Sequence, residues 1–254
     1  MREITESRWV AFRHACRVNR NRVLLLAGAA AVAVVVVVLV ILVAGSGGGS
    51  STTTTTLAAP TGTGGTAQTP ASIFADIPQR GDTLGVATAP ATLTVFEDPQ
   101  CPYCREWELG ALPTVVSEFV RAGRVKIVYR GINILGPNSD AGLAAVYAAG
   151  KQNKLWDMAD ALYAIQGPEN SGWIDAAAIR KAALAAGANA DAIIAAMPSA
   201  AVAAMVTNAH QQASALGVGG TPTFVLQLSL GAPAQLNAPL DASGFSAVLA
   251  AALK

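Results

Sequence analysis

The sequence predicts an α/β domain of roughly 180 residues, placed after an apolar membrane segment and a flexible linker. Three observations carry this prediction. Two short apolar runs, Thr92–Glu97 and Arg124–Tyr129, have the pattern of strands and are separated by a helical segment. The alanine-rich stretch 140–216 is expected to be all helical, and a third apolar run at 223–226 precedes a last helix.

The N-terminal 44 residues predict a membrane anchor. Residues 1–22 carry six arginines, and residues 23–44 are an unbroken apolar run without charge. A helix of that length spans roughly 33 Å, enough to cross a bilayer core of about 30 Å. A cleaved signal peptide has a shorter apolar core, about 7–15 residues, so we expect an uncleaved single-pass anchor in the cell membrane. The next positive charge is Arg80, which predicts a cytoplasmic tail at 1–22 and an extracytoplasmic position for the rest.

A linker and one folded domain are expected to follow the anchor. Residues 45–72 are rich in Gly, Ser, Thr and Pro and lack apolar periodicity, which indicates a flexible tether. Residues 73–254 are long enough for one ordinary domain. Disulfides persist outside the cytoplasm, so this domain is expected in a compartment that permits them.

Composition and charge exclude several classes of function. The net charge is +1 and 13% of residues are charged, without the basic clusters that a nucleic-acid surface needs. The chain has three cysteines; Cys16 lies in the basic tail and is interpreted as an incidental thiol. We expect no metal at Cys101 and Cys104, because zinc takes four ligands and the only histidines are His14 and His210.

The elements of the domain can be placed in order. Residues 73–88 form a leading segment with an edge strand, and Pro113 is expected to kink the first helix. Asn138 or Ser139 is a candidate cap of the next helix, and Ser243 of the last. The expected helices are Glu106–Ala122, Asp140–Lys151, Lys154–Ile165, Asp175–Ala186, Ala190–Ala196, Ser199–Leu216 and Ser243–Leu253.

A Cys-x-x-Cys pair stands where the first strand meets the first helix. Cys101 and Cys104 are two residues apart, a spacing typical of a redox dithiol between a strand and a helix. The helix N-terminus favours the thiolate, which is the form that attacks disulfides. No cofactor is expected beyond the Cys101–Cys104 disulfide itself.

Pro222 stands at the start of the last long strand, a position that proline seldom takes. One explanation is a cis Thr221–Pro222 bond facing the cysteines, with the Thr221 backbone free to pair with an extended substrate. The other is an ordinary turn proline, and the local sequence leaves both open.

Taken together, these motifs resemble a known family. The stretches TLGVATAPATLTVFEDPQCPYC, LGPNSDAGLAAVYAAGKQNKLWDMADALY and GVGGTPTF are similar to the DsbA-like thiol–disulfide oxidoreductases of the thioredoxin superfamily, in a membrane-anchored bacterial form. The resemblance covers residue 73 to the C-terminus and implies a thioredoxin fold with a helical insertion at about 136–216. It also implies that Cys101 is the exposed nucleophile, that Cys104 is the buried resolving thiol, and that Pro222 is cis.

The chain departs from that family at positions that tune the thiols. The buried carboxylate that many relatives hold six residues before the first cysteine is Val95 here, so Cys104 must exchange its proton with water, Glu97 or Asp98. The alternative for Glu97 and Asp98 is a solvated turn pair. Pro102 and Tyr103 lie between the cysteines, and Tyr103 replaces a histidine that can carry positive charge.

The leading functional hypothesis is a disulfide donor to reduced or unfolded secreted proteins. A membrane quinone-linked oxidase of the DsbB or VKOR kind would reoxidise it. The same residues could serve a reductase, for example in cytochrome c maturation. An isomerase is less expected, because such enzymes usually add a dimerisation domain, and the segment before residue 73 is a low-complexity tether. A redox-inert binding or chaperone module is the third alternative.

Overall fold

Two parallel strands form the centre of the sheet. In the computed structural model, which describes residues 72–254, β3 (Ala91–Glu97) pairs in parallel with β4 (Val125–Gly131) from Ala91 opposite Val125 to Glu97 opposite Gly131. Both strands are buried for most of their length because helices cover both faces of the sheet. The predicted tail, anchor and linker, up to residue 71, lie outside the described residues.

The other strands extend the sheet on both sides. The order is β1-β2-β4-β3-β5-β6, and β5 runs antiparallel to β3. The short strands β1 and β2 form the edge expected in the leading segment. The bounds are β1 (Gln79–Arg80), β2 (Thr83–Leu84), β5 (Thr223–Leu228) and β6 (Ala234–Gln235).

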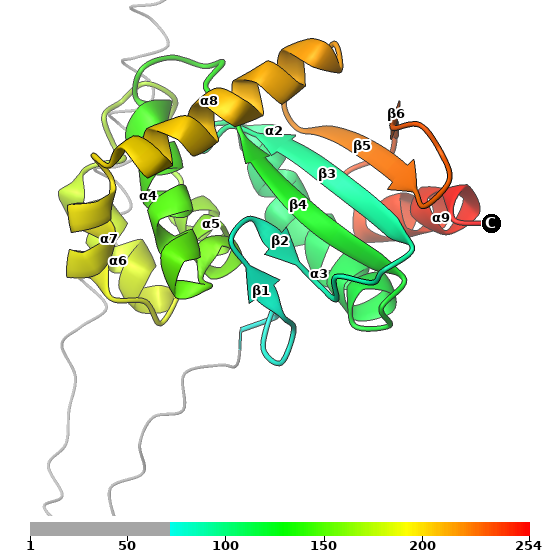
Figure 1. Cartoon of the computed structure of the whole chain (residues 1–254). Coiled ribbons are helices and arrows are strands. Elements are labelled where there is room, and N and C mark those ends of the chain that lie inside the picture. The colour runs from blue at the N-terminus through cyan, green and yellow to red at the C-terminus, as the bar shows by residue number, and fades with distance from the viewer. Residues whose placement is uncertain (1–71) are drawn as a thin grey trace, which may run out of the picture. The chain divides into compact units, whose positions relative to one another are not determined.

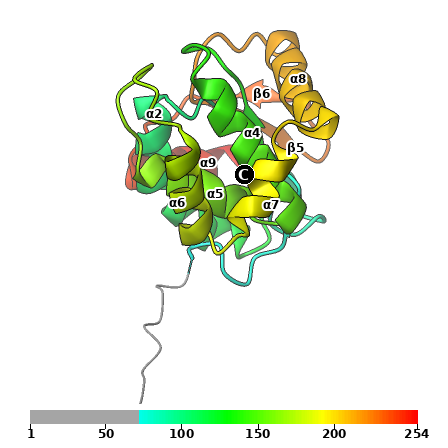
Figure 2. The ribbon, with the colours of Figure 1, turned by 90° about the vertical axis from the view of Figure 1, so that its left-hand side faces the viewer.

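The helices fall into three groups (Figures 1 and 2). The segment from α2 to η2 connects β3 to β4, and α9 packs beside α3 on the same face of the sheet, while α8 crosses the other face. Helices α4 to α7 pack together beyond the sheet. The bounds are α2 (Pro102–Glu106), η1 (Trp107–Ala111), α3 (Leu112–Val115), η2 (Val116–Val120), α4 (Ser139–Ala149), η3 (Gly150–Gln152), α5 (Leu155–Ala164), α6 (Ala176–Ala185), α7 (Ala190–Ala196), α8 (Ala200–Ala215) and α9 (Ala242–Ala252).

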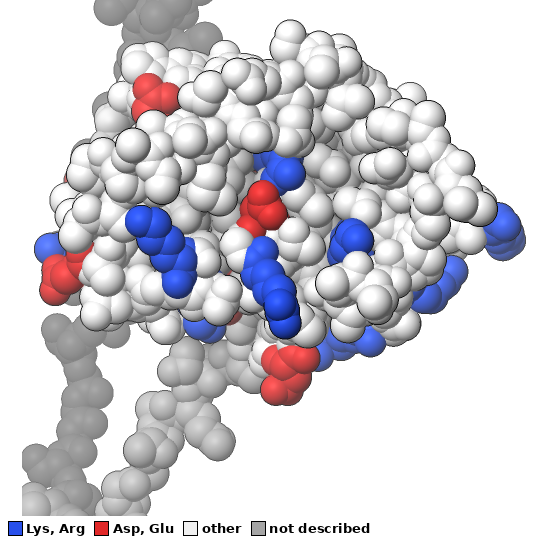
Figure 3. All heavy atoms as spheres, in the orientation of Figure 1, with Lys and Arg blue, Asp and Glu red and all other residues white. Residues whose placement is uncertain are grey.

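The predicted α/β class and helical insertion are confirmed. Helices α4 to α8 all lie between β4 and β5 in the chain, and an aromatic contact joins them to the sheet. Tyr129 on β4 packs edge-on against Tyr147 and Trp156 of the insertion, with ring centroids 5.7 and 5.9 Å apart. Charged side chains are sparse on the face seen in Figure 3, where most of the surface is uncharged.

The first helix differs from the prediction. It begins at Pro102, four residues earlier than expected, because the proline occupies the first helical turn, where its missing N–H costs no hydrogen bond. The helical hydrogen bonds widen to a π pattern over η1, immediately before α3, which holds Pro113 in its first turn. A π segment adds a residue to a turn and redirects the side chains that follow.

Two expected caps are wrong. Neither Asn138 nor Ser139 caps α4 with its side chain, because the Ser139 hydroxyl is engaged with Asp98. Helix α9 is capped by Asp241, whose carboxylate accepts from the N–H of Gly244 at 2.9 Å, so Ser243 is not its cap.

Among residues 72–254, no single helix combines the length and hydropathy needed to cross a bilayer. Helices α7 and α8 meet the two criteria only when taken together, across a bend of 73°.

Candidate active site

The two cysteines lie at the end of β3 and the start of α2. Cys101 is the N-cap residue, with extended backbone angles, and Cys104 lies in the first turn. The resemblance implied an exposed Cys101, but only 4% of its surface is exposed, against 0% for Cys104. The residues between them, Pro102 and Tyr103, do reach solvent, and Tyr103 is 62% exposed. Any partner must therefore approach Cys101 closely through the surface around Tyr103.

The cis-proline loop lies directly against Cys101. The Thr221–Pro222 peptide bond is cis, as the resemblance implies, so the reading as an ordinary turn proline is wrong. Cys101 Sγ is 3.2 Å from the carbonyl oxygen of Thr221, to which Cys101 donates when it is protonated. Residues 120 positions apart in the chain thus meet at one sulfur, because β5 lies beside β3 in the sheet.

The two thiols have opposite acidities. The pKa of Cys101 is lowered to about 6, and the largest cause is the hydrogen bond from the Cys104 thiol. The Thr221 side chain and the backbone N–H groups at the start of the helix contribute less. Together these hydrogen bonds outweigh burial, which acts in the opposite direction. Burial above all, and then the neighbouring Cys101 and Glu97, raise the pKa of Cys104 well above its ordinary value. At neutral pH the site therefore holds one thiolate, on Cys101, and one thiol, on Cys104.

Asp98 anchors the helical insertion to the active-site loop. Its carboxylate is fully buried and accepts four hydrogen bonds, which come from Gln100 N (2.9 Å), Ser139 Oγ (2.6 Å), Ile134 N (2.9 Å) and Leu135 N (3.0 Å). The interpretation of Asp98 as a solvated turn residue is therefore wrong. Because its oxygens are fully engaged, the Asp98 carboxylate serves as an anchor for the loop.

Two further side chains of the insertion hold the backbone of this loop. Gln166 Nε2 donates to the carbonyls of Pro99 (2.9 Å) and Cys101 (3.1 Å), and the Tyr163 hydroxyl donates to the carbonyl of Asp98 (3.1 Å). The side chain of Gln100 is bonded to Ser139 and to Asn170. The sequence analysis did not identify these residues, and no local pattern marks them.

Glu97 is also buried, and a second carboxylate lies beside it. Neither Glu97 nor Glu108 is exposed, and none of their four carboxylate oxygens receives a hydrogen bond from the described residues 72–254. Glu97 lies near Tyr163, Glu108 and Trp107 without a well-aligned donor from any of them. Burial raises the pKa of Glu97 to about 8, and it raises the pKa of Glu108 well above its usual range. Such a pair retains at least one proton at neutral pH.

Glu97 is therefore not a solvated turn residue either. Glu108 was missed in the sequence analysis, although a signal existed. It follows Cys104 by four residues in a helix, and residues at that spacing lie on one face. Val95 and Glu97 are alternate residues of β3, so they share a face of the sheet, and Glu97 lies nearer the cysteines.

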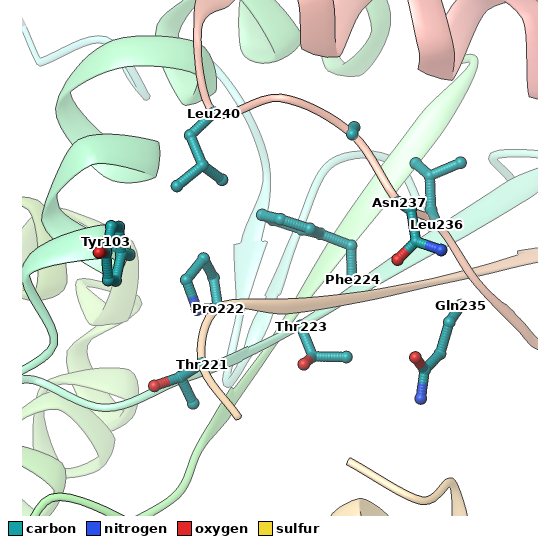
Figure 4. A pocket seen from close by; sticks show the side chains of 10 residues that line it. Tyr103, Thr221, Pro222, Thr223, Phe224, Gln235, Leu236, Asn237 and Leu240 are labelled. Carbon is teal, nitrogen blue, oxygen red and sulfur yellow. The ribbon is translucent and has the colours of Figure 1, made fainter. Parts of the chain in front are cut away.

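A groove opens beside the cysteines (Figure 4). It has a volume of about 260 Å³ and is lined at one end by Tyr103 and Pro222 and farther along by Leu236 and Asn237. No charged residue lines it. Phe224 lines the groove, and its ring packs against the buried rings of Trp107 and Phe245, with centroids 4.4–4.8 Å apart within this cluster.

The chain is similar to known thioredoxin-fold proteins. A family model described as Thioredoxin matches residues 79–232, more than half of the chain. A probable disulfide bond formation protein D of Bacillus cereus is 34% identical over 93 residues, which are 36% of this chain and 43% of that protein. DsbG of Escherichia coli, a thiol:disulfide interchange protein, is 32% identical over 77 residues, or 30% and 29% of the two chains. The chain thus spans less than half the length of these relatives.

Two solved structures share the fold over nearly their whole length. A thioredoxin-like oxidoreductase from Silicibacter pomeroyi is 26% identical with a TM-score of 0.55, over 71% of this chain and 95% of the other. Oxidised BdbD from Bacillus subtilis has a TM-score of 0.60 at 18% identity, over 70% and 97%.

Proposed function

We propose that this chain, which belongs to the DsbA-like branch of the thioredoxin family, is a protein-disulfide oxidoreductase that donates disulfides to reduced proteins outside the cytoplasm. The observation that carries this proposal is the opposite acidity of Cys101 and Cys104 across one short helix turn. A thiol of low pKa is a good leaving group and stabilises the reduced form, and both effects favour giving a disulfide away.

The proposed reaction begins with the oxidised Cys101–Cys104 pair. A substrate thiolate attacks Cys101 Sγ, the Cys101–Cys104 bond breaks, and its electron pair goes to Cys104, which takes up one proton. A second substrate thiolate then attacks the substrate sulfur of the mixed disulfide and releases Cys101 as a thiolate. The substrate gains one disulfide, the site gains two electrons and one proton, and the second proton goes to solvent.

The groove beside Cys101 supports an uncharged, extended peptide as the substrate segment. Thr221, whose carbonyl oxygen lies 3.2 Å from Cys101 Sγ, lines this groove, and the exposed lining is mostly polar and uncharged, so an extended main chain can hydrogen-bond along it. Gln235 and Asn237 also line the groove and offer amide groups to a peptide backbone. Compact folded proteins do not present such a segment, which fits the preference for reduced, unfolded clients.

The predicted anchor supports the proposed localisation and partner. The apolar run at 23–44 would hold the domain at the outer surface of the cell membrane, on a linker of about 28 residues with a root-mean-square reach of roughly 30 Å. That reach suits reoxidation by a quinone-linked membrane oxidase of the DsbB or VKOR type.

The resting redox state of the pair in source cells tests the direction of transfer. Cells are quenched with acid and alkylated with a mass-tagged maleimide, in a Cys16→Ser background so that only Cys101 and Cys104 report. A mostly oxidised pair is expected. A mostly reduced pair would contradict the proposal and favour the reductase alternative. In a companion assay, Cys101→Ser should abolish oxidation of a reduced, unfolded test protein, and unchanged oxidation would contradict the proposal. Full cellular function of Cys101→Ala would favour a redox-inert binding module.

A further inference from the structure

The buried carboxylate pair continues toward a second cavity on the far side of α5. Glu108 lies close enough to Asp160 for the charge of Asp160 to contribute to the raised pKa of Glu108. Asp160 is half-buried and lines a cavity of about 460 Å³ between α5 and α6. This cavity shares no lining residue with the groove beside Tyr103. Three carboxylates therefore form a series from the buried thiol of Cys104 to solvent.

We propose that Glu97, Glu108 and Asp160 form a proton path that connects Cys104 to the cavity between α5 and α6. The path supplies the proton that the proposed reaction requires at Cys104, and so it rests on the proposed function. Glu97 exchanges the proton with Cys104, while Glu108 and Asp160 act through Glu97. An exit on this side stays open when a substrate covers the groove.

The surroundings of the pair explain why it can carry a proton. Within the part of the chain that the structure describes, no lysine or arginine makes an ion pair with Glu97 or Glu108. For a buried carboxylate pair without a cation, the state that shares one proton is lower in free energy than the state with two negative charges. The pair can pass that proton to a neighbouring group. The π segment η1 contains Glu108 and packs against α5, the helix that carries Asp160.

Other titratable groups face this path from each neighbouring element. Around the pair they are hydroxyls and thiols, which stay neutral at neutral pH apart from Cys101. At the outer cavity they are one further carboxylate and two lysines. The facing groups are Cys101 and Cys104 on α2, Tyr129 on β4, Tyr147 on α4, Tyr163 and Asp157 on α5, and Lys154 and Lys181 at the cavity.

The proton balance can be followed during reoxidation by oxidised glutathione. The Cys101 thiolate first attacks the glutathione disulfide, which forms a mixed disulfide and releases one glutathione thiolate. Cys104 must then lose its proton before its sulfur attacks Cys101 and expels the second glutathione. Only this closing step draws on the path, because the first step uses a thiol that is already ionised at pH 7.

The test follows the two steps separately in the full-length chain carrying Cys16→Ser. Reduced protein is mixed with oxidised glutathione at pH 7, quenched with acid at intervals, and analysed by intact mass. In Glu108→Gln and Asp160→Asn, the mixed disulfide with glutathione is expected to form at the wild-type rate. The Cys101–Cys104 disulfide should then form about tenfold or more slowly, since a positioned proton acceptor typically contributes 10²–10⁴-fold. Glu106→Gln, an exposed carboxylate on the same helix segment, is the matched control and should close normally.

A rescue experiment separates proton transfer from a structural effect. Acetate can enter the cavity between α5 and α6 and replace the missing carboxylate, so it should restore closure in Asp160→Asn in proportion to its concentration. Wild-type closure rates in both variants would overturn the path, and so would a slow Asp160→Asn that acetate does not restore. Absence of the first step in the wild-type chain would instead contradict the proposed function.

Discussion

The acidity of Cys101 can be tested by changing its neighbour. The largest cause of its lowered pKa is the hydrogen bond from the Cys104 thiol. Cys104→Ala removes that donor, whereas Cys104→Ser keeps a hydroxyl in the same place. In a Cys16→Ser background both variants leave Cys101 as the single cysteine, so any thiolate signal comes from one sulfur.

The size of the effect follows from the strength of the lost bond. A hydrogen bond to a charged group contributes about 1.5–3 kcal/mol, and one pKa unit corresponds to about 1.4 kcal/mol. Cys104→Ala should therefore raise the pKa of Cys101 from about 6 to roughly 7–8. Cys104→Ser should titrate near the wild-type value because its hydroxyl can donate to the same thiolate.

The assay is a pH titration of thiolate absorbance in the ultraviolet, checked against the pH dependence of alkylation by iodoacetamide. Equal titration midpoints in the alanine and serine variants would refute the assigned cause, and so would a Cys101 midpoint in Cys104→Ser close to an ordinary thiol. Equal midpoints that stay near 6 would make the helix N-terminus the main source of acidity, since it is unchanged in both variants.

The lowered pKa also sets how far ionisation favours the reduced form. With a pKa of about 6 against an ordinary value of 9.0, ionisation of Cys101 stabilises the reduced state by about 1.4 kcal/mol at pH 7. For a two-electron couple this equals about 30 mV. The pKa is depressed, so the contribution is complete above pH 9, shrinks as the pH falls, and is lost below pH 6.

Three further predictions concern stability. The difference in Tm between the reduced and oxidised forms should be smaller at pH 5 than at pH 8, because ionisation of Cys101 stabilises the reduced form only above pH 6. An unchanged difference in Tm would contradict the lowered pKa of Cys101. Asp98→Asn should lower the free energy of unfolding by about 3 kcal/mol and Tm by roughly 6–12 °C. Asp191→Asn, at an exposed position, should change the free energy of unfolding by less than about 0.5 kcal/mol. Equal effects of the two substitutions would mean that Asp98 does not anchor the loop. Gly142→Ala places a Cβ 2.8 Å from the Cβ of Pro99, so it should lower the free energy of unfolding by about 1–3 kcal/mol. Hydrogen exchange of the backbone amides in the active-site loop should speed up. Unchanged exchange would argue against this packing.

Much of the fold could be predicted because its elements are marked locally. The helix expected at Ala190–Ala196 has those bounds in the structure, and the strand expected at Thr92–Glu97 begins one residue earlier. Both are delimited by residues with strong local preferences, such as the Asn189 cap of α7. The cysteine pair and the glycine–threonine–proline turn are likewise short motifs that need no distant partner to be recognised.

The parts that escaped prediction depend on contacts across the chain. Ser139 was expected to cap its own helix, but its hydroxyl bonds to Asp98, 41 residues earlier. Glu97 and Asp98 carry charge and precede a proline, which locally favours an exposed turn, yet the insertion buries both. The inward position of Glu108 was not predicted, and it lies in a π segment that no sequence pattern announced. Local preference was overridden in each case by tertiary packing.

The way the insertion holds the active-site loop has a consequence for engineering. Gln166 and Tyr163 bind only main-chain carbonyls of the loop, and those bonds do not depend on the side chains between the cysteines. Pro102 and Tyr103 are exposed, and neither side chain makes a hydrogen bond to another residue of 72–254. The side chains at positions 102 and 103 can therefore be changed without removing the hydrogen bonds that support the loop. A library at these two positions should sample many redox potentials on one unchanged scaffold.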